Sequence, residues 1–69
     1  MANSYVNDNA QSNGDHEVHK DGCTWLAKVV SKTYLGDYSS CHSAVAKAKE
    51  KYPSTADGCA ACCSDCHKS

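Results

Sequence analysis

The chain has 69 residues, which suit a single small cysteine-rich domain covering 1–69, and its formal net charge is −1 at pH 7. All seven basic residues are lysines, whereas a nucleic-acid interface normally uses a basic face and arginine, so nucleic acid is disfavoured as a partner. There is no Phe and only one Trp, against six Cys and four His. We therefore expect cysteine chemistry to support a core that is marginal at this length.

The N-terminal stretch MANSYVNDNAQSNGD lacks the basic and apolar regions of a signal peptide. No stretch approaches the roughly 18 apolar residues of a membrane span, so no membrane association is expected. If the chain is complete, we expect a cytoplasmic protein, whose reduced thiols favour metal binding over disulfides. If the cysteines are instead paired as disulfides, we expect a secreted protein.

The first predicted element is a β-hairpin. Two short alternating runs, 4–9 and 15–20, flank a turn at Asn13-Gly14, which is a typical hairpin turn sequence. Tyr5 and Val18 are expected to face the core.

A third strand is predicted at 29–35, where β-branched residues and an aromatic occur together, and Gly36-Asp37 is expected to end it. Before this strand, Trp25 and Leu26 are the largest apolar side chains in their segment. We predict a core position for Trp25, although a half-exposed Trp could anchor a partner.

The clearest element is a helix over 39–52, capped by Asp37 or Ser39 and stopped by Pro53. Its inward face is predicted from residues at three- and four-residue spacing: Cys41, Ala44, Val45, Ala48 and Tyr52. The segment 53–58 is expected to be a loop. Together these elements predict an α+β domain with a two- or three-stranded antiparallel sheet and one helix.

Cysteines and histidines concentrate in HEVHKDGC and CAACCSDCH. A C-x-x-C pair such as Cys59/Cys62 lets two thiolates bind one tetrahedral zinc ion. His19 and Cys23 form an H-x3-C pair across a tight turn. These four residues predict a closed structural zinc site joining the hairpin to the C-terminal tail, where metal binding contributes about 10–16 kcal/mol to folding in small zinc peptides.

The stretches VHKDGCTWL, TYLGDY and ADGCAAC resemble small bacterial modules with the pattern H-x3-C-x2-L … G-x-Y/F … A … C-x2-C. Those modules are distantly similar to the metal-binding domain of Ada-type alkylation-repair proteins. The resemblance covers about residues 3–67 and implies a zinc-stabilised α+β module. It places the ligands on the same four residues, and it does not carry over the methyl-accepting chemistry of the repair proteins.

Four further candidate ligands remain after this assignment: Cys41, Cys63, Cys66 and His67. They could form a second zinc site, or Cys41 could form a disulfide with Cys63 or Cys66. His19 could also be a surface residue, with Cys63 or Cys66 as the fourth ligand in its place.

Catalysis is disfavoured, because no βαβ unit frames the C-x-x-C pair and the core is too small for a large substrate pocket. We therefore predict a non-enzymatic module with zinc as its cofactor and a structural role, serving interaction with a protein partner. Two alternatives are a secreted small protein with three disulfides and a thiol redox or metal-handling protein.

Overall fold

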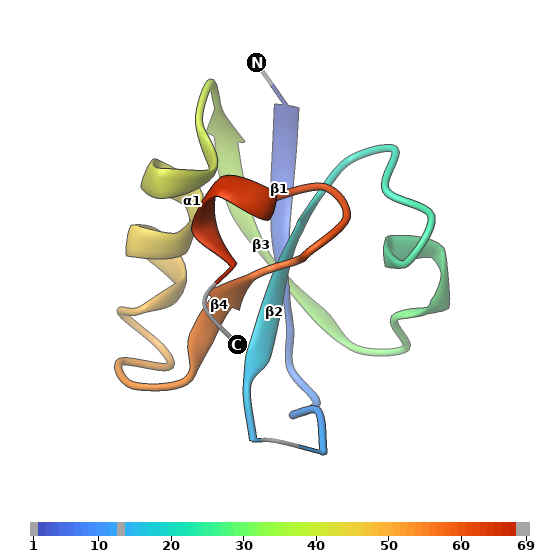
Figure 1. Ribbon diagram of the computed structural model, residues 1–69, viewed down its shortest axis with the longest axis vertical. Coiled ribbons are helices and arrows are strands. Elements are labelled where there is room, and N and C mark those ends of the chain that lie inside the picture. Colours follow the sequence, from blue (N-terminus) through green and yellow to red (C-terminus); the bar gives the residue numbers. More distant parts are fainter. Residues whose placement is uncertain (1, 13, 68–69) are drawn as a thin grey trace.

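The chain folds into a four-stranded sheet with one helix packed on one of its faces (Figure 1), as described for residues 2–12 and 14–67 of a computed structural model. The strands and the helix are β1 (Ala2–Asn7), β2 (His16–Lys20), β3 (Lys32–Tyr38), α1 (Cys41–Ala48) and β4 (Ala56–Gly58). Two short 3₁₀ turns are η1 (Leu26–Lys28) and η2 (Ser64–Cys66). The predicted α+β class is confirmed.

The sheet is mixed, with strand order β3-β1-β2-β4. β1 pairs antiparallel with β2 and β3, and β4 pairs parallel with β2. The three predicted strands pair antiparallel, as expected, and the sheet has in addition a fourth strand, β4, in the segment 53–58 that was expected to be a loop. This three-residue strand has no alternating pattern of its own. It is defined by its pairing with β2, after α1 has carried the chain across the sheet.

The predicted antiparallel pairing of β1 and β2 is confirmed, with Val6 directly opposite Val18 and both fully buried. Asn13 of the predicted turn lies outside the described residues. Successive side chains of a strand point to opposite faces, so Tyr5 lies on the other face of the sheet. There its ring centroid is 5.4 Å from that of Tyr34. The predicted core position of Tyr5 was wrong, and Val6 occupies the core in its place.

β3 begins later than predicted and continues through Gly36 instead of ending there. Gly36 has a φ of +134°, and a Cβ atom at this position would lie 3.1 Å from the ring of Tyr38. The Tyr38 hydroxyl donates a hydrogen bond to the carbonyl of Leu35 at 2.9 Å. Glycine thus permits a register shift against β1 within the strand, because the aromatic ring covers the space that a side chain would need.

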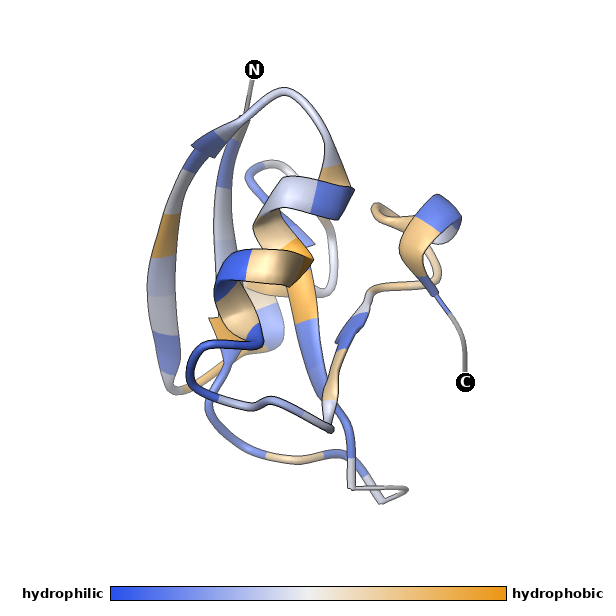
Figure 2. Cartoon of the chain, turned by 90° about the vertical axis from the view of Figure 1, so that its left-hand side faces the viewer, coloured by the Kyte–Doolittle hydropathy of each residue, from blue (hydrophilic) through white to orange (hydrophobic). Residues whose placement is uncertain are grey.

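The N-cap of α1 is Ser40, whose hydroxyl accepts a hydrogen bond from the His42 amide at 3.0 Å. The predicted caps at Asp37 and Ser39 were therefore wrong by one or more residues. The helix also ends at Ala48, before the predicted end at 52, although the amide of Tyr52 still donates to the Ala48 carbonyl. Its predicted inward face is confirmed, because Ala44, Val45 and Ala48 are buried in the core cluster. Figure 2 shows α1 lying in front of the sheet.

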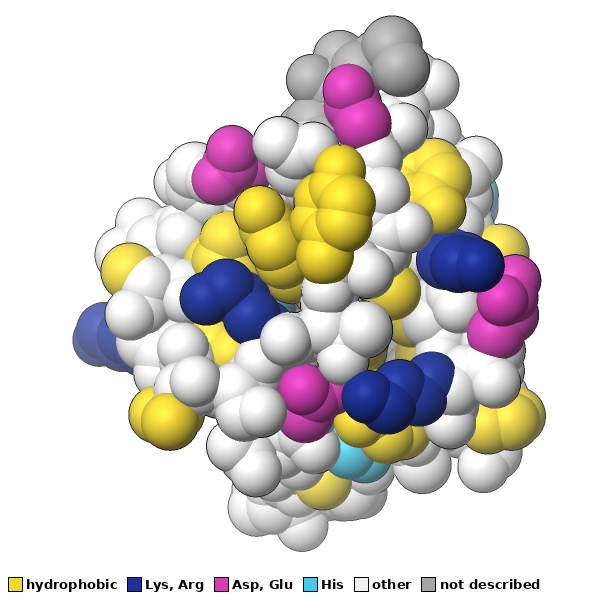
Figure 3. Space-filling view, turned by 180° about the vertical axis from the view of Figure 1, so that it is seen from behind, with side chains coloured by type: hydrophobic (Ala, Val, Ile, Leu, Met, Phe, Trp, Pro, Cys, Tyr) yellow, Lys and Arg dark blue, Asp and Glu magenta, His cyan; other side chains and the backbone are white. Residues whose placement is uncertain are grey.

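The core is small and consists of aliphatic side chains and one cysteine: Val6, Val18, Leu35, Ala44, Val45, Ala48 and Cys66. Trp25 is 53% exposed, so its predicted core position was wrong. Its segment, 21–31, lies on the opposite side of the molecule from α1 (Figure 1) and therefore does not reach the space between helix and sheet. Hydrophobic side chains also gather beside lysines on the rear surface (Figure 3).

Asp8 joins three parts of the fold at the edge of the core. Its carboxylate accepts hydrogen bonds from the Thr33 hydroxyl at 2.7 Å, the Tyr52 hydroxyl at 3.0 Å and the Lys51 ammonium at 3.3 Å. The Thr33 hydrogen bond, followed by those of Tyr52 and Lys51, outweighs the effect of burial and lowers the pKa of Asp8. The folded state therefore favours the ionised carboxylate.

We expect Asp8→Asn to lower the free energy of unfolding by about 1–2 kcal/mol at pH 7, because hydrogen bonds to a charged acceptor are lost. Since the folded pKa lies below the ordinary value of 3.8, this contribution is fully present above pH 3.8 and is lost as the pH falls through the lowered pKa. Urea unfolding between pH 7 and pH 3 measures it. The difference in free energy of unfolding between wild type and Asp8→Asn should decrease as the pH is lowered. Asp37→Asn, at an exposed position of β3, should show neither effect.

Candidate metal centre

The first half of the site comes from β2 and the turn that follows it. His19 points away from the core because its neighbour Val18 points into it, yet His19 is only 2% exposed. The Cys23 amide donates to the Lys20 carbonyl at 3.1 Å, closing a tight turn in which Gly22 has a φ of +89°. This conformation favours glycine. The turn places the Cys23 Sγ 3.7 Å from the His19 Nδ1.

The second half follows β4. The Cys59 amide donates to the Val18 carbonyl at 2.9 Å, so parallel pairing with β2 carries Cys59 alongside His19. The Cys63 amide then donates to the Cys59 carbonyl at 2.8 Å, which closes a turn around Cys62. The Cys62 Sγ lies 3.4 Å from the Lys20 amide, which donates to it. Backbone hydrogen bonds therefore position these two sulfurs against the end of β2.

The ligand atoms of His19, Cys23, Cys59 and Cys62 all lie within 4.8 Å of one another. We call these four residues the four-residue centre. A tetrahedral zinc ion with ordinary bond lengths separates two sulfurs by about 3.8 Å and a sulfur from a nitrogen by about 3.6 Å. The Cys23 and Cys59 sulfurs are 4.0 Å apart, and the Cys23–His19 distance of 3.7 Å is similarly close. The centre therefore has the dimensions of a tetrahedral metal site.

The surroundings of His19 favour the form of imidazole that binds metals. Burial lowers the pKa of His19, against a smaller opposing effect of Glu17, so the ring is held neutral. Its Nδ1 faces the sulfur of Cys23, and its Nε2 lies 3.7 Å from the Glu17 Oε1. A carboxylate on the far side of a ligating histidine is a common arrangement that orients the ring and selects its tautomer.

The thiols of the centre differ in how readily they ionise. Burial raises the pKa of Cys62, and the nearby thiols raise it further. For Cys23, burial also opposes ionisation, but hydrogen bonds from the Cys62 thiol and from the Trp25 and Leu26 amides lower its pKa overall. The protein alone therefore stabilises one thiolate and disfavours a second beside it. A bound cation would permit several thiolates at once, because it supplies the compensating charge.

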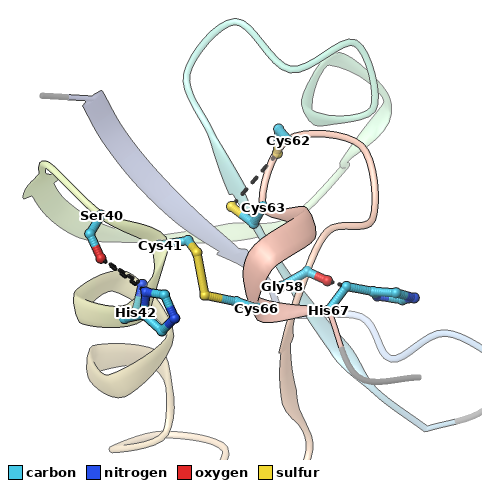
Figure 4. Close-up of a disulfide and its surroundings, with 8 residues drawn as sticks. All are labelled: Ser40, Cys41, His42, Gly58, Cys62, Cys63, Cys66 and His67. Carbon is cyan, nitrogen blue, oxygen red and sulfur yellow. Dashed lines mark hydrogen bonds between the residues drawn. A yellow bond between two sulfur atoms is a disulfide. The ribbon is translucent and has the colours of Figure 1, made fainter.

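The structure brings together the four residues that spacing selected as zinc ligands, and it places the four remaining candidates elsewhere. Cys41 and Cys66 form a disulfide with their Cα atoms 6.3 Å apart, joining α1 to η2 (Figure 4). As a disulfide they are not zinc ligands, and this is one of the two pairings that the sequence left open. The other four cysteines are free thiols, so three disulfides are not what the structure shows.

Cys63 and His67 lie outside the four-residue centre. The Cys63 Sγ is 3.9 Å from that of Cys62, within a buried position. The His67 Nδ1 lies 3.0 Å from the Gly58 carbonyl and 3.4 Å from the Asp57 carboxylate. His67 therefore has partners other than the sulfurs, and its proposed place in a second zinc site is not supported by its position.

Sequence reasoning overlooked three contributors to the sites. Glu17 could have been found, because alternation along β2 places it on the same face as His19. The amide of Lys20 carries no sequence signal, since its contact with Cys62 spans 42 residues. His42 was not among the predicted ligands and is exposed, yet a ligand atom of its ring lies within 4.8 Å of the Cys41 and Cys66 sulfurs.

Comparison with protein-family models, curated proteins and solved structures gave no match. Over the described residues, no helix has the length and apolar character required to cross a membrane. Functional assignment therefore rests on the chemistry of the centre itself.

Proposed function

We propose that this chain is a zinc-binding module in which the ion is held by His19, Cys23, Cys59 and Cys62 and has a structural role. The observation that carries the proposal is the convergence of four ligand atoms within 4.8 Å of one another. They come from two segments far apart in the chain, since Cys23 and Cys59 are 36 positions apart. Three thiolates and one neutral imidazole are a typical ligand set for structural zinc.

The position of the centre supports a structural role. Among the described residues, the buried core cluster contains aliphatic side chains and one cysteine, and its aromatic neighbours Tyr38 and Tyr52 are only partly buried. An ion at the four-residue centre would connect the end of β2 to the chain following β4, on the face of the sheet that α1 leaves uncovered. Metal binding in small zinc domains contributes about 10–16 kcal/mol, which is comparable with the whole stability of an ordinary domain.

Native mass spectrometry on reduced, zinc-loaded protein, combined with circular dichroism during chelation, tests this proposal. We expect zinc at the four-residue centre and a loss of ordered structure when a chelator removes it. Zinc affinity should also decrease as the pH falls, because protons compete for the same sulfur and nitrogen atoms. A chain that folds equally well without metal would contradict the structural role, and preference for another thiophilic ion would correct the choice of zinc.

We also propose that the module is non-enzymatic and binds a protein partner through its exposed aromatic side chains. Trp25 and Tyr34 are 53% and 57% exposed. The Lys28 ammonium lies 4.8 Å from the centroid of the Trp25 ring, in the segment that begins at the proposed zinc ligand Cys23. Trp side chains of this kind are enriched among residues that dominate binding energy at protein interfaces.

If Trp25 serves binding and not folding, Trp25→Ala should change the free energy of unfolding by less than about 1 kcal/mol, since surface substitutions outside special contacts have small effects. Denaturant unfolding and the zinc stoichiometry should both remain close to wild type. Val45→Ala, which truncates a buried core residue, is the matched control and should be destabilising. A large loss of stability in Trp25→Ala would show that the side chain is structural.

A further inference from the structure

A second group of metal-binding atoms lies on the helix side of the sheet, apart from the four-residue centre. The sulfurs of Cys41 and Cys66 and a ring nitrogen of His42 all lie within 4.8 Å of one another. Cys41 and His42 are the first two residues of α1, and Cys66 ends η2 (Figure 4). The disulfide occupies the two sulfurs in the structure, but it leaves the imidazole beside them.

We propose that the Cys41–Cys66 disulfide is the oxidised form of a second metal site, which in its reduced form binds a thiophilic divalent cation through Cys41, His42 and Cys66. This second site goes beyond the structural zinc proposed above and does not depend on it. The cation would join α1 to η2 in place of the disulfide, so the same two elements are connected in either state.

The position of His42 argues for ligation, because nothing in the helix fold requires a histidine there. The side chain is exposed on α1, and its Nδ1 lies 3.3 Å from the Ser40 hydroxyl. Ser40 is itself fixed as the N-cap, since its oxygen accepts the His42 amide. When Nδ1 is hydrogen-bonded to Ser40, Nε2 remains available for a metal, and such a partner on the other ring nitrogen is typical of ligating histidines.

The two sulfurs need only a small movement to change from one state to the other. A disulfide holds its sulfur atoms about 2 Å apart, and a tetrahedral ion holds two thiolates about 3.8 Å apart. Cys41 is half-buried, whereas Cys66 is packed in the core. Rotation of the Cys41 side chain at the start of the helix can therefore supply the separation without moving the core residue.

The second site would keep one coordination position open. Cys41 and His42 line one end of a groove of about 880 Å³, which extends past Asp65 to Cys62 and Cys23 of the four-residue centre. Water or an incoming ligand in this groove can complete the coordination of an ion held by three protein atoms. Sites with three protein ligands and an open position differ in this way from closed structural sites. The ion at the second site would therefore exchange more readily than the zinc of the four-residue centre.

The redox step requires a thiol or disulfide partner of the glutathione class. In one direction, two external thiols reduce the Cys41–Cys66 bond, giving two protein thiols and one external disulfide; the protein thiols then lose two protons as they bind the divalent cation. In the other direction, an external disulfide takes up two electrons from the two metal-bound thiolates and two protons from solvent. The products are the protein disulfide, two external thiols and the released cation.

Zinc titration followed by native mass spectrometry tests the proposal, using protein reduced with a phosphine and the same protein reoxidised with glutathione disulfide. We expect one more zinc ion per chain in the reduced protein than in the oxidised protein. His42→Ala should lower the affinity for the additional ion at least 10-fold and leave the affinity of the four-residue centre unchanged. His67→Ala is the matched control, since His67 has partners outside both groups of ligands, and should alter neither ion.

The proposal is overturned if the reduced and oxidised proteins bind equal numbers of ions, or if His42→Ala leaves the additional ion unchanged. Both histidine variants keep all six cysteines, so a failure to fold is not an expected complication. If the reduced protein binds one zinc ion, and that ion depends on His42, the result would contradict zinc binding at the four-residue centre and support the second site. The two proposals can therefore fail separately.

Discussion

Replacement of Cys59 by serine is expected to leave the four-residue centre without zinc and to lower the free energy of unfolding by more than about 4 kcal/mol, a loss typical of removing a structural metal. Cys59 is 2% exposed and lies 4.0 Å from the Cys23 sulfur. A serine hydroxyl binds zinc poorly compared with a thiolate. Circular dichroism and denaturant unfolding, with and without added zinc, measure the effect.

Cys63→Ser is the matched control for this experiment. Cys63 is equally a buried thiol of the same loop, but its sulfur is not among the four grouped ligand atoms. We expect the control to retain one zinc ion at the four-residue centre and to lose only about 1 kcal/mol from burying a hydroxyl. If Cys63→Ser removed the zinc and Cys59→Ser did not, the ligand assignment would be wrong.

Among the Gly→Ala substitutions possible in this chain, Gly58→Ala is expected to destabilise the fold most. A Cβ atom at Gly58 would lie 2.7 Å from the Cys63 carbonyl oxygen and 2.7 Å from the Cys66 Cβ. These atoms belong to the loop that carries Cys62 and to the residue that is disulfide-bonded to α1, so they cannot move aside independently. We expect a destabilisation of about 3 kcal/mol, the upper part of the usual range for overpacking.

The same substitution should weaken zinc binding, because displacing the loop moves the Cys62 sulfur away from the Lys20 amide. Competition with a chromogenic chelator gives the change in zinc affinity. Gly14→Ala provides the comparison, since a Cβ atom there meets nothing within 4 Å and only its φ of +90° is unfavourable. It should reduce stability modestly without changing zinc affinity. If both variants changed zinc affinity equally, the close packing at Gly58 would not be what positions the Cys62 sulfur.

Both predictions concern the loop after β4, which contacts β2 and is joined to α1 by the disulfide. Cys62 faces β2 on one side of the loop, and Cys66 faces α1 on the other. Gly58 lies beneath the loop, where only hydrogen fits. The small aliphatic core is in this way supplemented by the Cys41–Cys66 disulfide on the helix side of the sheet. On the opposite side, the four-residue centre is a group of side chains that could hold a metal ion.

The sequence by itself determined the local features of this protein. Asn13-Gly14 and its flanking runs indicated the hairpin, and the three- and four-residue spacing of Ala44, Val45 and Ala48 indicated the inward face of the helix. Spacing also selected the four residues that the fold brings within 4.8 Å. The hairpin turn, the helix face and each of the two ligand pairs depend on neighbours a few residues apart, because turn conformation and helix periodicity are local properties.

Only the tertiary structure decided the features that depend on distant pairing. β4 became a strand through its parallel pairing with β2, and Cys41 was paired with Cys66 because η2 folds back onto α1. Tyr5 and Trp25 were misplaced because hydrophobicity predicts burial somewhere but does not specify which face of the sheet the helix covers. Which side chains meet across the sheet is set by the path of the whole chain.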